Sequence, residues 1–282
     1  MPYDHANKIG NQGDVVKHAV LAHLIGNVGA GKRFVYAETN AGRPLCELPH
    51  RGEWQAGVGI FSRCDLVVAD REAMGRGEPA RFPTLSRYDQ LCVGREIGAG
   101  DSYPGSSVVA FRALDGCDRS FRLWETHTDT FQHLQEHFRD ASAVRVSDHD
   151  GYQGVSDLLD KETPSLVLID PPDTKANRKI ARLIVRLCEK KAPFLCWTPT
   201  GGAAPQAKGQ PARPPKPHFE DLLKGGKCSA FFVTWTNGWG PRACQLTVSA
   251  DLGRHARDAA QAVCTVMRTP NAPWALHEPD DP

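Results

Sequence analysis

The 282-residue sequence contains no run of 18 or more apolar residues, so we expect no membrane-spanning helix. Its first residues lack a basic region followed by an apolar stretch, and we therefore expect no secretory signal. The sequence has nine cysteines, an odd number, and no two of them form a Cys-x-x-Cys pair. Scattered cysteines of this kind are typical of reduced thiols in a cytoplasmic protein rather than of disulfides or a zinc site, and we expect no bound metal.

Several familiar catalytic and phosphate-binding motifs are also missing. There is no Gly-x-Ser-x-Gly turn of a serine hydrolase, and no Gly-x-Gly-x-x-Gly follows the first expected strand, which argues against NAD. Residues 26–33 resemble a P-loop, but Arg33 replaces the Ser or Thr that holds magnesium, and the segment follows a helix instead of a strand. The net charge of +1 shows none of the basic excess common in nucleic-acid enzymes.

What the sequence does contain is a repeated alternation of short apolar runs and amphipathic stretches. Continuous apolar runs are typical of parallel strands that are buried on both faces. The predicted strands span residues 34–37, 120–125, 144–146, 166–169, 193–197, 230–235 and 245–249. The predicted helices span residues 14–25, 107–114, 128–138, 154–160 and 176–190. This order predicts an α/β fold with a doubly wound, mostly parallel sheet and an antiparallel hairpin at one edge.

Two segments interrupt the alternation. Residues 54–100 carry many charges and glycines with weak helical patterns, and we predict a small inserted helical subdomain there. Residues 1–53 and 101–282 then form the main domain. Residues 198–217 are rich in proline and glycine, so we predict a mobile loop that covers the face of the molecule carrying the strand ends.

Four acidic residues stand at or just after the ends of predicted parallel strands: Glu38, Glu125, Asp150 and Asp170. The carboxyl ends of parallel strands share one edge of the sheet, where open α/β folds bind ligands. Glu125 can accept hydrogen bonds from both hydroxyls of a ribose, and Asp150 from an adenine amino group, with Gly151 allowing a close approach. The pattern suits a nucleoside cofactor without phosphates, such as S-adenosylmethionine. The alternative is an α/β domain whose turns happen to be acidic.

The strand at residues 166–169 ends in Asp170, Pro171 and Pro172. Because prolines cannot continue the strand, the chain must turn at its carboxyl end, which places Asp170 where α/β enzymes carry out chemistry. This turn resembles the Asp-Pro-Pro-aromatic turn of methyltransferases that act on the amino group of adenine, with Asp173 in the position of the aromatic residue.

A wider resemblance covers most of the chain. Seven ordered blocks resemble the bacterial large-subunit (23S) ribosomal RNA adenine-N6 methyltransferase J family. These blocks are Tyr3-Asp4-His5, residues 10–18, Glu38 to Gly42, Tyr103 to Ser107, Glu125-Thr126-His127, Asp150-Gly151-Tyr152 and Ile169 to Pro172. The resemblance implies a Rossmann-like class I methyltransferase fold with a small helical insertion. It also implies S-adenosylmethionine as the cofactor and the N6 amine of an adenine in ribosomal RNA as the methyl acceptor.

The same resemblance implies roles for individual residues. The implied cofactor contacts are Lys17, Asn40, Ser106, Glu125, Asp150, Gly151 and Asp170. Tyr3 and His5 would lie beside the target base. The Asp170 carboxylate and the Pro171 carbonyl would accept hydrogen bonds from the adenine amino group and orient its nitrogen toward the methyl group.

The substrate side departs from the family pattern, because Asp173 stands where the family has a tyrosine that stacks on the flipped base. Three hypotheses therefore stay open. The first is an RNA adenine-N6 methyltransferase in which Trp197 or Tyr3 supplies the stacking. The second is a related enzyme that acts on a small polar or amine substrate paired with Asp173. The third is a non-catalytic descendant that binds RNA or a protein. A monomer is the favoured state in each case.

Overall fold

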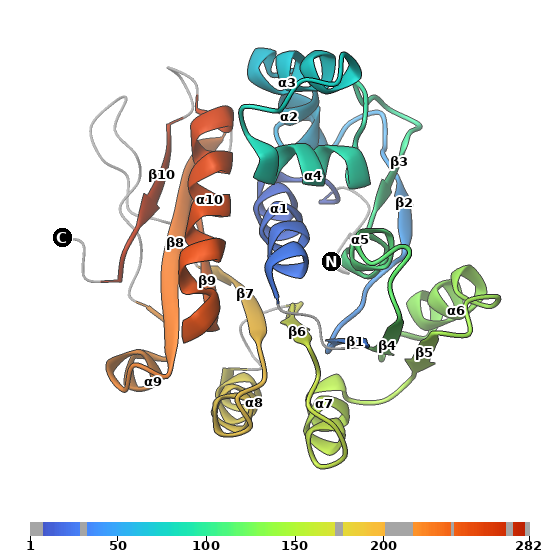
Figure 1. Ribbon diagram of the computed structural model, residues 1–282, viewed down its shortest axis with the longest axis vertical. Helices are drawn as coiled ribbons and strands as arrows, with labels where there is room; N and C mark the ends of the chain where they lie inside the picture. The colour runs from blue at the N-terminus through green and yellow to red at the C-terminus, as the bar shows by residue number, and fades with distance from the viewer. Residues whose placement is uncertain are drawn as a thin grey trace.

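The fold is built around one eight-stranded sheet with the strand order β10-β8-β9-β7-β6-β1-β4-β5 (Figure 1). The computed structural model describes residues 8–28, 33–172, 177–200, 217–237, 240–268 and 273–279. The parallel strands are β1 (Phe34–Glu38), β4 (Arg119–Trp124), β5 (Val144–Ser147), β6 (Leu166–Ile169) and β7 (Phe194–Thr200). The antiparallel strands are β8 (Cys228–Asn237), β9 (Gly240–Ser249) and β10 (Trp274–His277).

The order of the parallel strands places a topological switch point at the centre of the sheet. Strand β1 pairs with β4 on one side and with β6 on the other. The chain therefore winds outward from β1 through β4 to β5, and then in the opposite direction from β6 to β7. This confirms the predicted doubly wound, mostly parallel sheet and its antiparallel hairpin. In such folds ligands bind outside the carboxyl ends of the strands at the switch point, here between β1 and β6.

Helices cover both faces of the sheet, which explains the continuous apolar runs of the parallel strands. Along β6 the side chains alternate, so that Leu166 and Leu168 join one core cluster and Val167 and Ile169 join another. The first cluster packs beneath α1 (Gln12–Asn27), α5 (Ser106–Ala113), α6 (Thr128–His137) and α10 (Gly253–Met267). The second packs against α7 (Gly151–Leu159), α8 (Asn177–Glu189) and α9 (Glu220–Lys224). Figure 1 shows these two layers on opposite sides of the sheet.

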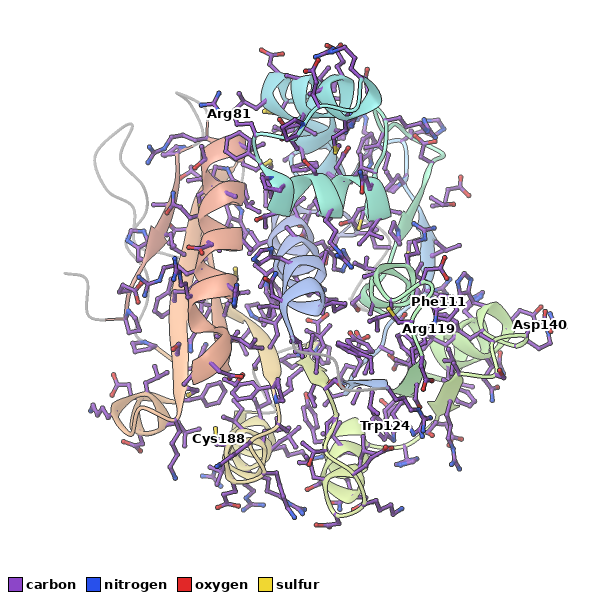
Figure 2. The ribbon with its side chains drawn as sticks, viewed as in Figure 1. Arg81, Phe111, Arg119, Trp124, Asp140 and Cys188 are labelled. Atoms are coloured by element: carbon purple, nitrogen blue, oxygen red, sulfur yellow. The ribbon has the colours of Figure 1, made fainter. Side chains whose placement is uncertain are left out.

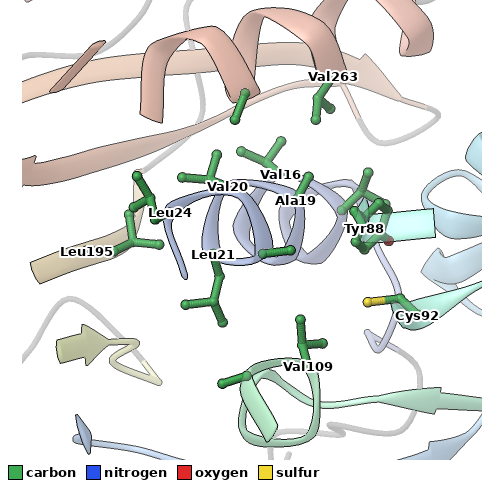
Figure 3. Close-up of a cluster of buried hydrophobic side chains, with 14 of the residues drawn as sticks. Val16, Ala19, Val20, Leu21, Leu24, Tyr88, Cys92, Val109, Leu195 and Val263 are labelled. Carbon is green, nitrogen blue, oxygen red and sulfur yellow. The ribbon is translucent and has the colours of Figure 1, made fainter. Parts of the chain in front are cut away.

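Helix α1 lies at the centre of the molecule (Figure 3). The sequence pattern predicts one apolar face on this helix, and this is wrong, because 12 of its 16 residues are buried. The helix packs against α10, α4 (Pro83–Cys92) and α5, so it has almost no solvent face. It begins at the Asn11 cap, whose side chain accepts a hydrogen bond from the Asp14 amide at 3.0 Å.

The segment predicted as an insertion is helical. It holds a 3-10 turn (Glu53–Gln55), α2 (Val58–Arg63), α3 (Asp65–Gly75) and α4. It lies between β2 (Leu45–Glu47) and β3 (Ser102–Pro104), which pair with each other as a small antiparallel sheet. Its buried side chains Trp54, Phe61 and Tyr88 join the same core cluster as α1. The division into a main domain and an inserted subdomain stays a prediction.

The described structure extends several expected elements and adds others. Strand β7 continues through Thr200, because residues 198–200 pair with Ala243–Gln245 of β9. The predicted loop is therefore wrong for its first three residues, and residues 201–216 lie outside the described part of the chain. Helix α10 and strand β10 are additional to the elements that the sequence pattern predicts. None of the described helices is both long and apolar enough to cross a membrane.

Candidate functional site

The strand ends form a continuous rim in which the acids from β1, β4, β5 and β6 lie side by side. Glu38, the last residue of β1, is in register with Leu123 of β4 and Leu168 of β6. Backbone hydrogen bonds continue this pairing past the strand ends, from the Thr39 amide to the Leu168 carbonyl at 3.1 Å and from the Glu125 amide to the Ser147 carbonyl at 3.0 Å. The predicted meeting of these acids at one edge is thus present in the structure.

The Asp170 carboxylate is held by a lysine that reaches the rim from α1. The Lys17 ammonium donates to Asp170 Oδ2 at 2.7 Å and lies 3.0 Å from Asp14 Oδ1. The exposed fractions of these side chains are only 9% for Lys17, 17% for Asp170 and 22% for Asp14. Burial alone would lower the pKa of Lys17, but the two carboxylates outweigh it and raise that pKa, so the lysine stays charged.

Trp197 lies on β7 beside Asp170, since Ile169 pairs with the preceding residue, Cys196. Its indole packs on α1, where a Cβ added to Gly13 would meet the ring at 2.9 Å. The Lys17 ammonium lies 5.4 Å from the centroid of the same ring, within the range of a cation–π contact. Trp197 is therefore a half-buried aromatic wall of the site.

Glu38 is completely buried between β1 and the start of α5. Its carboxyl accepts hydrogen bonds from the Tyr36 hydroxyl at 3.0 Å and from the Ser106 hydroxyl. Burial raises the pKa of Glu38 to about 8, against the hydrogen bonds that favour the charged form. Glu38 is therefore largely neutral at pH 7, and it fixes the orientation of Ser106, which the resemblance assigns to the cofactor site.

Glu125 and Asp150 occupy the outer part of the rim and hold the backbone there. Glu125 accepts from the Gly42 amide at 3.1 Å and from the His127 amide at 2.8 Å, tying the turn after β1 to the turn after β4. Asp150 caps α7 by accepting from the Tyr152 amide at 2.9 Å.

The second oxygen of Asp150 pairs with Lys179 of α8 at 2.5 Å. Partial burial opposes ionisation of Asp150, but Lys179 and the amides of α7 lower its pKa. The side chains of this pair are 40% and 62% exposed, so water screens the interaction far more than it screens the Lys17–Asp170 pair.

Gly151 and Asn40 lie where the turn after β1 meets the start of α7. A Cβ on Gly151 would stand 1.9 Å from the Thr39 carbonyl oxygen, so the absence of a side chain is required by the protein's own packing. Asn40 accepts a hydrogen bond from the Thr39 hydroxyl at 2.9 Å and is half-buried. Both residues are on the rim, as predicted, and the close approach at Gly151 is made by the backbone of the turn after β1.

Comparison with known proteins relates the chain to one family. The model of the family described as "Ribosomal RNA large subunit methyltransferase D, RlmJ" matches residues 76–192. The chain resembles the large-subunit ribosomal RNA methyltransferase J family. The resemblance expected from the sequence is confirmed.

Two curated methyltransferases J and one crystal structure extend the comparison. The Haemophilus influenzae protein named "Ribosomal RNA large subunit methyltransferase J" is 29% identical over 182 residues, and its namesake from Escherichia coli is 28% identical over 179. Each match covers 61% of this chain and 59% of the relative, so it spans about three fifths of the curated proteins. A Legionella pneumophila crystal structure superimposes with a TM-score of 0.65 at 20% identity, covering 97% of this chain and 99% of that one. The doubly wound, Rossmann-like α/β fold expected from the sequence is confirmed.

The structure brings most of the expected site residues together and shows two that sequence reasoning missed. Tyr3, His5 and Asp173 lie outside the described residues, whereas Pro171 is buried directly after Asp170. The missed residues are Asp14 and Tyr36, which hold Lys17 and Glu38 in place. Their spacing carried a signal, because Asp14 is one helical turn before Lys17, and Tyr36 shares a face of β1 with Glu38.

Proposed function

We propose that this chain is an S-adenosylmethionine-dependent methyltransferase that modifies the exocyclic N6 amine of an adenine in large-subunit ribosomal RNA. The observation that carries the proposal is the Asp170-Pro171-Pro172 turn at the β1/β6 switch point, beside a rim of acids from neighbouring strands. This is where a doubly wound sheet binds its ligand, and the motif is of the type that orients an adenine amino group.

The charged and polar groups of the rim match those of S-adenosylmethionine. The cofactor carries a sulfonium, an ammonium and a carboxylate, so it has a net positive charge. Asp14, Asp150 and Asp170 supply carboxylate acceptors at the rim, and Lys17 supplies a cation beside two of them. Glu125 uses two of its roughly four acceptor positions for backbone amides and keeps the others for ribose hydroxyls. Lys17 would pair with the cofactor carboxylate, and Asp150 would accept from its adenine.

When bound, the cofactor would supply an electrophilic methyl group. The lone pair of the adenine N6 nitrogen is delocalised into the ring, so the protein has to orient this poor nucleophile. The Asp170 carboxylate and the Pro171 carbonyl would accept its two N–H groups and direct the lone pair toward the methyl group. Lys17 supports this role by holding Asp170 Oδ2 in a fixed position at 2.7 Å.

The target base also needs a surface to stack on once it has left its helix, which costs a few kcal/mol. Trp197 lies next to Asp170 in the sheet and offers an aromatic ring at the edge where the parallel strands end. Stacking on such a ring is worth about 1–3 kcal/mol per base. The wall formed by Trp197 supports an RNA adenine as the substrate despite the aspartate at position 173.

The test is methyl transfer from labelled S-adenosylmethionine to unmodified large-subunit ribosomal RNA, with the product nucleoside identified by mass spectrometry. The wild type should produce N6-methyladenosine, and Asp173→Tyr should retain or raise that activity, since it adds a ring and removes a charge that repels phosphate. If RNA is inert with both forms while small amines accept methyl groups, the proposed substrate is wrong. RNA methylation by the wild type that Asp173→Tyr abolishes would instead make Asp173 a determinant of base recognition.

A further inference from the structure

Helix α8 carries a concentration of positive charge that the rest of the chain does not share. The whole sequence is balanced, with 34 basic and 33 acidic residues. In residues 177–191, by contrast, six side chains are Lys or Arg and only Glu189 is acidic. The near-neutral net charge therefore conceals a locally basic surface.

One face of α8 is buried in the core, and two of its cations form ion pairs within the protein. Its inner face is apolar, with Ile180 and Ile184 buried against the sheet. Toward α7, Lys179 pairs with Asp150, and Arg186 pairs with Asp160 at 2.6 Å. On another side, the Cys188 thiol Sγ of α8 lies 3.6 Å from the carbonyl oxygen of Lys227, the residue before β8 (Figure 2).

Four further cations have no such structural use. Arg178, Arg182, Lys190 and Lys191 are all exposed, and none forms an ion pair with another described residue. We call these four residues, two on the helix and two in the turn that follows it, the α8 basic face. Arg178 stands in the first turn of the helix, which contains no acidic residue, although the positive end of the helix dipole disfavours a cation there. An anionic partner would offset this unfavourable arrangement.

The basic face starts next to the proposed active site. Helix α8 follows Asp170-Pro171-Pro172 in the chain, so its N-terminal end lies on the same side of the sheet as the rim. From Arg178 to its last residue, Glu189, the helix advances about 16 Å at roughly 1.5 Å per residue. The neighbouring helix α7 carries exposed acids, Asp157 and Asp160, so the cations are not spread over this whole layer.

We propose that the α8 basic face binds the phosphate backbone of the RNA whose adenine enters the rim. The identity of the RNA rests on the proposed function, whereas the need for a polyanion rests on charge complementarity alone. Such contacts are independent of base sequence and release counterions, so they make binding depend on salt. Arg178 and Arg182 are nearest the rim and would contact phosphates closest to the flipped base.

The experiment compares two double variants of the full-length protein. Arg178→Gln/Arg182→Gln removes two charges of the basic face, and Arg254→Gln/Arg257→Gln removes two exposed charges from α10, on the opposite layer. Affinity for protein-free large-subunit ribosomal RNA is measured by fluorescence anisotropy over a series of KCl concentrations. The α8 variant should bind more weakly at low salt, with a salt dependence of log K shallower by about 1–2. The α10 variant should match the wild type, and both should bind S-adenosylmethionine as the wild type does.

Each outcome separates this inference from the proposed function. If the α8 variant keeps the affinity and salt dependence of the wild type while RNA is still methylated, the basic face is not the RNA contact and the function stands. Loss of affinity in both double variants alike would mean a non-specific charge effect and would also overturn the inference. If RNA binds through α8 but is not methylated, the surface stands and the proposed reaction fails. Absence of RNA binding by the wild type would contradict both.

Discussion

The rim holds two pairs of acids that look alike in the sequence and differ in their surroundings. The inner pair, Glu38 and Asp170, ends the two central strands and is covered by α1 and α5. The outer pair, Glu125 and Asp150, follows β4 and β5 near the edge of the sheet, where both side chains bind backbone amides. Glu38 accepts from the hydroxyl groups of Tyr36 and Ser106, and Asp170 accepts from Lys17. Glu125 and Asp150 accept from backbone amides, and Asp150 also pairs with the exposed Lys179.

Because their surroundings differ, we expect the two pairs of acids to have different roles. A buried carboxylate is sensitive to the charge and hydrogen bonds around it, because the protein screens these interactions poorly. A carboxylate at the edge is screened by water and keeps free acceptor positions for a ligand. We therefore expect the inner pair to govern stability, protonation and chemistry, and the outer pair to govern affinity for the cofactor.

The largest expected effect is on stability, at the inner ion pair. Lys17→Met removes the cation that binds both Asp14 and Asp170, and removing one partner of a buried pair costs about 3–5 kcal/mol of unfolding free energy. The matched control is Lys179→Met, which breaks the exposed pair with Asp150 and should cost at most about 1 kcal/mol. Urea denaturation measures both. Equal losses in the two variants would show that the inner and outer acids do not differ in the proposed way.

The next effect is on turnover. Asp170→Ala removes an acceptor for the reacting amino group and should lower the rate of methyl transfer at saturating cofactor by about 100-fold or more. Its cofactor dissociation constant should change far less. The control is Asp157→Ala, which removes an exposed carboxylate of α7 and should leave both quantities unchanged. An undiminished rate in Asp170→Ala would refute the role of the inner acid in the reaction.

The outer acid should show the opposite pattern. Glu125→Ala should weaken cofactor binding by about 1–3 kcal/mol, because a charge-assisted acceptor for ribose is lost. Since Glu125 does not contact the reacting nitrogen in the proposed site, the rate at saturating cofactor should stay near that of the wild type. Calorimetry gives the affinity, and single-turnover kinetics give the rate. Unchanged affinity in this variant would remove Glu125 from the cofactor site.

A smaller effect concerns the pH dependence of stability at Glu38. Its pKa of about 8 in the folded protein lies above the ordinary value of 4.5, so the folded state binds the proton more tightly than the unfolded state. The stabilisation is fully present below pH 4.5 and is lost as the pH rises toward 8, with a slope of at most about 1.4 kcal/mol per pH unit. Glu38→Gln should flatten the dependence of the unfolding free energy on pH over this interval. Identical pH profiles for Glu38→Gln and the wild type would count against a neutral Glu38.

Local sequence patterns were enough to locate the rim. Four of the five parallel strands, β1, β4, β5 and β6, end at an acid or within a few residues before one, so these strand ends and their acids follow from local patterns. The same patterns carry no information on contacts between distant segments. Lys17 and Asp170 are 153 residues apart, and only the tertiary fold places α1 over the switch point.

Where local composition and long-range pairing disagree, the pairing decides. The proline- and glycine-rich composition from residue 198 onward predicts a loop, yet β7 continues to Thr200 because β9 supplies hydrogen-bonding partners. The sequence predicts that Gly151 allows close approach of a ligand, and the structure shows that the Thr39 carbonyl occupies this space. The predictable part of the site is therefore its position, and the unpredictable part is which neighbours each residue meets.

The most direct test of the central claim, that the acidic rim is a site for S-adenosylmethionine, is calorimetric titration of this cofactor into the wild-type protein. Our account predicts saturable binding of one molecule per chain, weakened by Glu125→Ala and largely kept in Asp170→Ala. No heat of binding at high micromolar cofactor, from protein shown by circular dichroism to be folded, would contradict it.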